Sequence, residues 1–120
     1  MKPYTSTELL IVRQQYSNYS WNSRRRGLDF ALTFEEYIDI VSRNCYYCDA
    51  PPRPVYNKKN KNYFAFMNGV DRYDNKIGYL LYNTRPCCSS CNYLKGSLDG
   101  DKFIAKVKSI MEVIYGKDST

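Results

Sequence analysis

The segment PCCSSCN, residues 86–92, decides the fold of this chain together with its earlier counterpart NCYYCDA, residues 44–50. In each segment two cysteines are separated by two residues, so both thiolates can point at one ion. The four cysteines are Cys45, Cys48, Cys88 and Cys91. Two such pairs complete the tetrahedral ligand set of structural zinc, and we predict a zinc site here; a disulfide or an iron–sulfur arrangement is the alternative.

A fifth thiol, Cys87, lies directly before Cys88 and could in principle replace it as a ligand. Three residues would then separate the two cysteines of the second pair, and the symmetry with the first pair would be lost. We therefore expect Cys87 to be a buried free thiol. Because the chain contains no histidine, any metal or acid–base chemistry must use Cys, Asp, Glu, Asn, Lys or Tyr side chains.

The length of 120 residues predicts a single domain whose modest core is reinforced by a metal. Within residues 1–120 we expect a helical part with a basic run (1–44), a zinc-stapled core (45–97) and a C-terminal helix (98–120). No apolar run approaches the roughly 18 residues that span a bilayer. The N-terminus also lacks the pattern of a secretory signal, so we expect an intracellular protein without membrane contact.

A formal charge of +6, from 18 Lys and Arg against 12 Asp and Glu, favours an acidic partner, of which nucleic acid is the commonest. Two clusters carry much of this charge, and Lys95 is assigned to the same binding surface. The clusters are Arg24, Arg25 and Arg26, and Lys58, Lys59 and Lys61. We expect them to grip the phosphates of DNA; the alternative is a solvated helix end and a solvated loop.

Local patterns predict several short elements. A capping box at Thr5 predicts a helix that runs to about Trp21, and a second capping box at Thr33 predicts a helix that stops before Asn44. Later elements follow from alternation and turn residues. They are a loop over 51–63 with a short strand in YFAFM (63–67), a hairpin of NGVDRYD (68–74) and GYLLYN (78–83), a short helix in SSCNYLKGS (89–97), and a last helix from Asp101 to Gly116.

The hairpin segment GVDRYDN, residues 69–75, places Asp71 beside Arg72 inside the long insertion between the two cysteine pairs. Asp71 and Asn92 offer hard oxygen ligands suited to Mg²⁺, which takes its remaining oxygens from water and a substrate phosphate. Arg72 could hold a phosphate oxygen. In the alternative interpretation Asp71 pairs with Arg72 or Lys95, and Asn92 caps the short helix.

These motifs together resemble the zinc-bound HNH nucleases of the ββα-metal class, closest in pattern to phage recombination endonuclease VII and small phage-type HNH proteins. The resemblance extends over RRRGLDFALTFEEY, CYYC, GVDRYDN, YNTRPCCSSCN and LKGSLDGDKF, from about Arg24 to Phe103. It implies an α+β fold, a small ββα-metal core with flanking N- and C-terminal helices. The implied catalytic residues are Asp71, Arg72, Asn83 and Asn92.

In this resemblance Asp71 and Asn92 hold a catalytic Mg²⁺ or Mn²⁺, Asn83 fixes the loop, and Arg72 stands where the family has a general-base histidine. An arginine stays protonated and accepts no proton. Water, Asp74 or Tyr73 would then have to serve as the proton acceptor.

The implied function is a metal-dependent DNA endonuclease that hydrolyses phosphodiester bonds without the usual histidine base. The alternative is a catalytically inactive, nuclease-derived zinc module that binds DNA or RNA, or a structural subunit of a nucleoprotein assembly.

Overall fold

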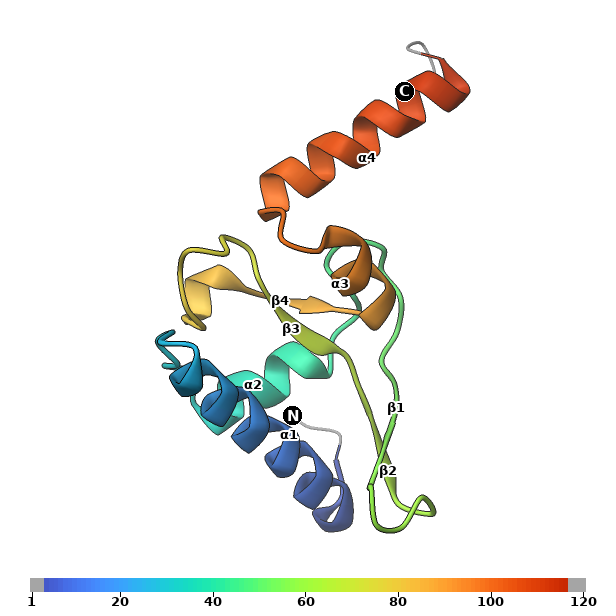
Figure 1. Cartoon of the computed structure of the whole chain (residues 1–120). Helices are drawn as coiled ribbons and strands as arrows, with labels where there is room; N and C mark the ends of the chain where they lie inside the picture. Colours follow the sequence, from blue (N-terminus) through green and yellow to red (C-terminus); the bar gives the residue numbers. More distant parts are fainter. Residues whose placement is uncertain (1–3, 117–120) are drawn as a thin grey trace.

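The computed structural model describes residues 4–116 and shows an α+β fold with two small antiparallel sheets (Figure 1). In chain order the elements are α1 (Ser6–Arg25), α2 (Phe34–Val41), β1 (Arg53–Tyr56), β2 (Phe64–Met67), β3 (Gly69–Arg72), the 3₁₀ helix η1 (Leu81–Asn83), β4 (Thr84–Cys87), α3 (Ser89–Lys95) and α4 (Gly100–Tyr115). The expected fold class is confirmed. The expected single domain stays a prediction, and its residues 1–3 and 117–120 lie outside the described part of the chain.

Both predicted capping boxes are present at the starts of α1 and α2. The side chain of Thr5 accepts from the backbone of Glu8 while Glu8 reaches back to the Thr5 backbone, and Thr33 forms the same pair of bonds with Glu36. The first helix continues beyond Trp21, the predicted end. Neither helix has a sequence long and apolar enough to cross a bilayer, and the same holds for every other helix within residues 4–116.

An aliphatic and aromatic core joins α1, α2 and the β1–β2 hairpin. Its buried members are Ile11, Val12, Leu32, Tyr37, Ile40, Val41, Ala65, Met67, Val70 and Tyr79. Tyr16 packs edge-on against three neighbouring rings at centroid distances of 5.3–5.4 Å. This core contains none of the cysteines and joins the N-terminal helices to the hairpin.

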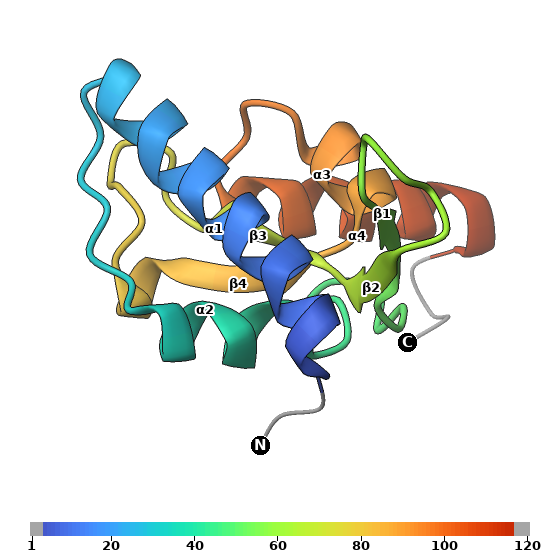
Figure 2. The same ribbon diagram turned by 90° about the horizontal axis from the view of Figure 1, so that it is seen from below.

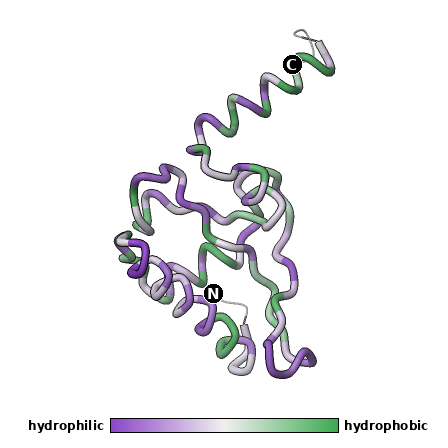
Figure 3. The backbone as a smooth tube through the Cα atoms, in the orientation of Figure 1, coloured by the Kyte–Doolittle hydropathy of each residue, from purple (hydrophilic) through white to green (hydrophobic). Residues whose placement is uncertain are grey.

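The loop expected over residues 51–63 contains strand β1, which pairs with the predicted short strand β2. The prolines of this segment favoured a loop, because proline has no backbone N–H to donate in a sheet. Strand β1 pairs with β2 alone, so it is an edge strand, where Pro54 is tolerated. The tip of this hairpin is hydrophilic in Figure 3 and carries the lysine cluster.

The prediction of a second strand in GYLLYN, residues 78–83, was wrong. Strand β3 pairs instead with β4, so that Asp71 lies opposite Arg85. Residues 78–83 form a bridge at Tyr79 and the helix η1, and the Gly78 carbonyl accepts a hydrogen bond from Asn83 Nδ2. The predicted hairpin therefore exists with a longer loop and a later second strand.

The β3–β4 pair lies between α1 and α2 on one face and α3 on the other (Figures 1 and 2). Successive strand residues point to opposite faces, so Val70 joins the aliphatic core while Asp71 faces α3. Helix α4 meets the body through Gly100 and Phe103 and then extends away from it. The sheet thus separates two environments, and the candidate site belongs to the α3 side.

Candidate functional site

The four predicted ligands Cys45, Cys48, Cys88 and Cys91 come together, with sulfur atoms that all lie within 4.8 Å of one another. The Cys48 and Cys88 sulfurs are 3.7 Å apart, close to the roughly 3.8 Å edge of a tetrahedron with zinc–sulfur bonds of about 2.3 Å. The chemistry and spacing of these thiols fit a tetrahedral metal ion. These four cysteines could therefore hold a metal.

The local backbone favours the thiolate of Cys45, whereas burial raises the pKa of Cys91. Burial acts to raise the pKa of Cys45, but backbone N–H groups of Cys88, Cys48 and Tyr47 hydrogen-bond to its sulfur, and the net effect lowers that pKa to about 7. Cys87 lies outside the four-sulfur group; it is buried, and burial raises the pKa of its thiol.

Asp71 is the centre of a second, charged cluster on the α3 face of the sheet. Its Oδ1 forms an ion pair with Lys95 Nζ at 3.0 Å, and its Oδ2 accepts a hydrogen bond from the Tyr47 hydroxyl at 2.7 Å. Asp71 is 5% exposed and Lys95 2% exposed. Burial, together with the bond to Asp71, raises the pKa of Tyr47, so this phenol stays a neutral donor.

Lys95 is thus a buried partner of Asp71 rather than the surface contact for nucleic acid that the sequence predicted. Its ammonium also donates to the carbonyl of Arg72 at 3.1 Å, which ties α3 to the end of β3. This pairing is the one that the alternative interpretation expected for Asp71. The other part of that alternative differs, because Cys88, not Asn92, is the N-cap of α3.

Arg72 points away from this cluster. Its Nη1 donates to the carbonyls of Asn75, at 2.5 Å, and Ile77, at 3.2 Å. The guanidinium lies 5.6 Å from the ring centroid of Tyr79, a residue of the aliphatic core. The structure therefore places Arg72 and Asp71 on opposite faces of β3.

Asn83 holds the same loop from the other side. Its Nδ2 donates to the carbonyls of Asp74, Ile77 and Gly78 at 3.1–3.3 Å, and its Oδ1 accepts from the Asp74 backbone at 2.9 Å. Asn83 is 4% exposed. These hydrogen bonds hold the loop, which is the role that the resemblance implied for Asn83.

Asn92 lies on α3 three residues before Lys95, so the two side chains emerge from neighbouring positions of one helix side. Lys95 turns inward to Asp71, whereas Asn92 is exposed. A substrate could therefore reach Asn92 without disturbing the buried pair.

A third group of side chains lies beside Asp71 and was not predicted from the sequence. Arg85 lies 4.7 Å from the ring centroid of Tyr73 and 5.2 Å from that of Tyr46. The Tyr73 hydroxyl donates to Asp101 at 2.6 Å, and this bond, with partial burial, raises the pKa of Tyr73 to about 12. Only the β3–β4 register reveals Arg85 as a neighbour of Asp71, and no local motif marks it.

The two basic clusters are exposed, as predicted, on separate elements. Arg24, Arg25 and Arg26 end α1, where the guanidinium of Arg25 lies 4.8 Å from the Trp21 ring centroid. Lys58, Lys59 and Lys61 occupy the tip of the β1–β2 hairpin.

Comparison with known proteins places this geometry among HNH folds. No protein-family model matches the chain. An uncharacterized protein of Acanthamoeba polyphaga mimivirus is 37% identical over 100 residues, which are 83% of this chain and 17% of that protein. The chain thus spans about a sixth of the length of this relative.

Among solved structures, the rare-cutting HNH restriction endonuclease PacI is similar with a TM-score of 0.63 at 21% sequence identity. The match covers 97% of this chain and 92% of that chain. This likeness shows that the chain has the fold of an HNH endonuclease.

Proposed function

We propose that this chain is an HNH-type DNA endonuclease that hydrolyses phosphodiester bonds at the surface above Asp71. The observation that carries the proposal is a buried carboxylate, Asp71, held by Lys95 and Tyr47 under the helix that bears the exposed Asn92. The similarity to PacI supports the same assignment. The variant HNH motif, with arginine in place of the histidine base, resembles the endonuclease VII pattern and belongs to this proposal.

We assign the four-cysteine cluster to structural zinc. Cys88 and Cys91 lie at the start of α3, and Cys45 accepts backbone contacts from both pairs, so one ion would fix α3 against the knuckle at residues 45–48. Tyr47, inside that knuckle, is bonded to Asp71. The zinc would therefore set the orientation of the acidic residue indirectly.

We further propose a second, catalytic cation held by Asp71 and Asn92. A carboxylate has roughly four acceptor positions, and Asp71 uses two of them for Lys95 and Tyr47. Carboxylates that bind metals are ordinarily hydrogen-bonded in this way. Asp71 and Asn92 would hold Mg²⁺ or Mn²⁺, which when bound supplies Lewis-acid stabilisation of a phosphate.

The remaining side chains position this site or bind the substrate. Lys95 and Tyr47 keep Asp71 in one orientation, while Arg72 and Asn83 keep the loop after β3 closed. Arg85, on the face of Asp71, supplies positive charge to a phosphate. Arg72 is turned away and stays protonated, and the raised pKa of Tyr73 keeps its phenol protonated near neutral pH. Water or Asp74 would then have to accept the proton, and cleavage should be slow.

The inactive, DNA-binding zinc module is the second candidate. The observation in its favour is that Arg72, at the position of the family's histidine base, is bound to loop carbonyls on the opposite face from Asp71. In this candidate the Asp71–Lys95 pair is purely structural.

A plasmid-nicking assay separates the two candidates. The zinc-loaded protein is incubated with supercoiled plasmid and Mg²⁺ or Mn²⁺, and compared with Asn92→Ala. Both Asn92 and its neighbour Tyr93 are exposed, so Tyr93→Ala is a matched control that should also keep the fold. We expect slow nicking by the parent and by Tyr93→Ala, and a loss of at least about 100-fold in Asn92→Ala. DNA binding without nicking by the parent would establish the inactive module.

A further inference from the structure

Three hollows share residues of α1, and two of them also border the β1–β2 hairpin. One of about 420 Å³ lies between Gln14, Gln15 and Asn18 on α1 and Lys58 and Lys59 on the hairpin. A second of about 470 Å³ shares Gln14 and Asn18 and continues to Trp21 and Arg24. Gln14 and Asn18 therefore stand at the junction of two hollows that end at the two basic clusters.

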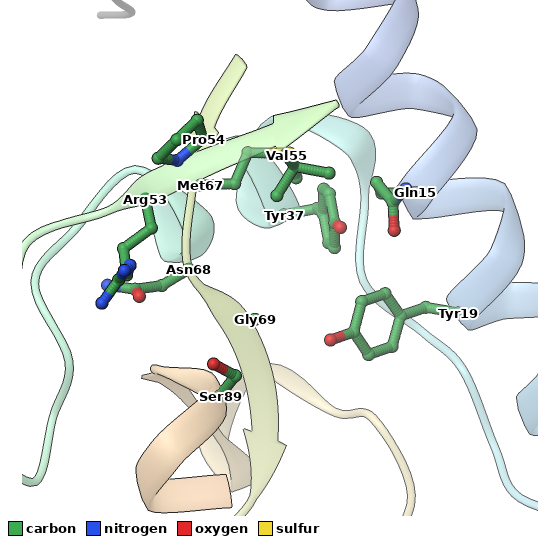
Figure 4. Close-up of a pocket in the computed structure, with 10 residues that line it drawn as sticks. All are labelled: Gln15, Tyr19, Tyr37, Arg53, Pro54, Val55, Met67, Asn68, Gly69 and Ser89. Carbon is green, nitrogen blue, oxygen red and sulfur yellow. The ribbon is translucent and has the colours of Figure 1, made fainter. Parts of the chain in front are cut away.

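The third hollow, of about 260 Å³, continues from Gln15 toward the candidate active site. Figure 4 shows Gln15 projecting from α1 on one side of it and Ser89, the first residue of α3, on the other. Asn92 lies one helical turn after Ser89. We name these three connected hollows the α1 groove.

Gln14 and Asn18 form a preorganised pair of amides in this groove. Gln14 Nε2 donates to Asn18 Oδ1 at 3.1 Å, across one turn of the helix. Within residues 4–116, Gln14 Oε1 and Asn18 Nδ2 make no other hydrogen bond. Gln14 Oε1 and Asn18 Nδ2 therefore remain available as one acceptor and one donor for a ligand in the groove.

The charged residues that line the α1 groove are all basic. Residues 9–28, which include the α1 wall, contain no Asp or Glu, and residues 50–70, which include the hairpin wall, contain none either. From Gln14 to Arg24 the helix rises roughly 15 Å, about the length of four base pairs at 3.4 Å each. Phosphates can thus be held at both ends of the groove while a base lies near its middle.

We infer that the Gln14–Asn18 pair reads the edge of a base in bound DNA and gives the protein a preference for adenine. In the major groove adenine presents an acceptor, N7, next to a donor, the N6 amino group. Asn18 Nδ2 can donate to N7, and Gln14 Oε1 can accept from the N6 amino group. The inference rests on one part of the proposed function, namely that the chain binds DNA.

Selection of bound sequences from a random DNA duplex pool tests this inference. The parent is compared with a Gln14→Ala/Asn18→Ala variant, and Asn22→Ala serves as the matched control. Asn22 is an exposed amide of the same helix that lines none of the three hollows. Melting curves verify that the variants fold, since alanine suits an exposed helix position.

We expect the parent and Asn22→Ala to enrich sites with a shared adenine, and the double variant to lose that discrimination by about 5- to 150-fold. Its affinity for non-selected DNA and its salt dependence should not change. No enrichment of adenine by the parent, no binding of DNA, or unchanged enrichment in the double variant would each overturn the inference. Cleavage is not scored here, so an adenine-selective protein that fails to nick plasmid would refute only the endonuclease proposal.

Discussion

The two halves of this molecule are held together by different forces. On one side of the β3–β4 sheet, ten buried residues of α1, α2 and neighbouring segments form a continuous core of aliphatic and aromatic side chains. On the other side, the buried cluster consists of cysteines, and the Asp71–Lys95 ion pair lies beside it. Apolar packing tolerates small changes, whereas a metal centre and a buried ion pair fail when one partner is lost. The α3 side should therefore be the more fragile half, and it is the half that carries the candidate active site.

Removal of the metal should have the largest effect. Structural zinc contributes roughly 10–16 kcal/mol of apparent binding energy in small domains, which is comparable with the whole stability of a typical domain, roughly 5–15 kcal/mol. We expect Cys45→Ser, or treatment with a chelator, to unfold β3, β4 and α3, as measured by hydrogen exchange and metal content.

Cys87→Ala is the matched control for this experiment, because Cys87 is as buried as Cys45 but lies outside the four-sulfur group. It should keep one bound metal and lose only about 1 kcal/mol of stability. Loss of metal in Cys87→Ala, or retention in Cys45→Ser, would show that the ligand assignment is wrong.

Breaking the buried ion pair should have the next largest effect. Lys95→Met leaves the Asp71 carboxylate buried without its cation, and we expect a loss of about 3–5 kcal/mol in the free energy of unfolding. Asp71→Asn/Lys95→Met removes both charges and keeps an acceptor for Tyr47. Its stability should return to within about 1–2 kcal/mol of the parent in denaturant titrations. A double variant as unstable as Lys95→Met would mean that the pair acts by packing, not by charge.

Charge removal at the hairpin tip should alter binding and leave stability unchanged. Each phosphate contact contributes about 0.9 to the slope of log affinity against log salt. We expect Lys58→Ala/Lys59→Ala/Lys61→Ala to lower that slope by up to about 2.7 in DNA-binding titrations. An unchanged slope would leave the lysine cluster as solvated surface.

The smallest effect concerns a polar atom in the otherwise apolar half. Tyr37 is 1% exposed, and within the described residues its hydroxyl has no hydrogen-bond partner. An unsatisfied buried hydroxyl costs about 1–3 kcal/mol. Tyr37→Phe should therefore raise the free energy of unfolding by about 1 kcal/mol in thermal or denaturant melts. A loss of stability would indicate that the hydroxyl has a favourable interaction in solution.

The sequence predicted features whose signals are local. The capping boxes at Thr5 and Thr33 and the cysteine pairs depend on residues a few positions apart or on spacing that one ion imposes. Strand β1 was missed because proline counts against a strand unless its edge position is known.

The charged contacts of the site could not be predicted in the same way. Asp71 and Lys95 are 24 residues apart, as are Tyr47 and Asp71, so each contact depends on the tertiary fold. The direction of Arg72 follows from strand alternation, but which face carries the site becomes known only when α3 is placed.

The central claim is that Asp71 has a catalytic role beyond its contribution to the stability of the half that contains the four-cysteine cluster. Its most direct test is the plasmid-nicking rate of zinc-loaded Asp71→Asn/Lys95→Met in Mn²⁺, measured beside the parent at equal DNA occupancy and after folding has been verified. We predict a folded, metal-containing double variant that binds DNA like the parent but nicks it at least about 100-fold more slowly. A double variant that nicks DNA at the rate of the parent would contradict the claim.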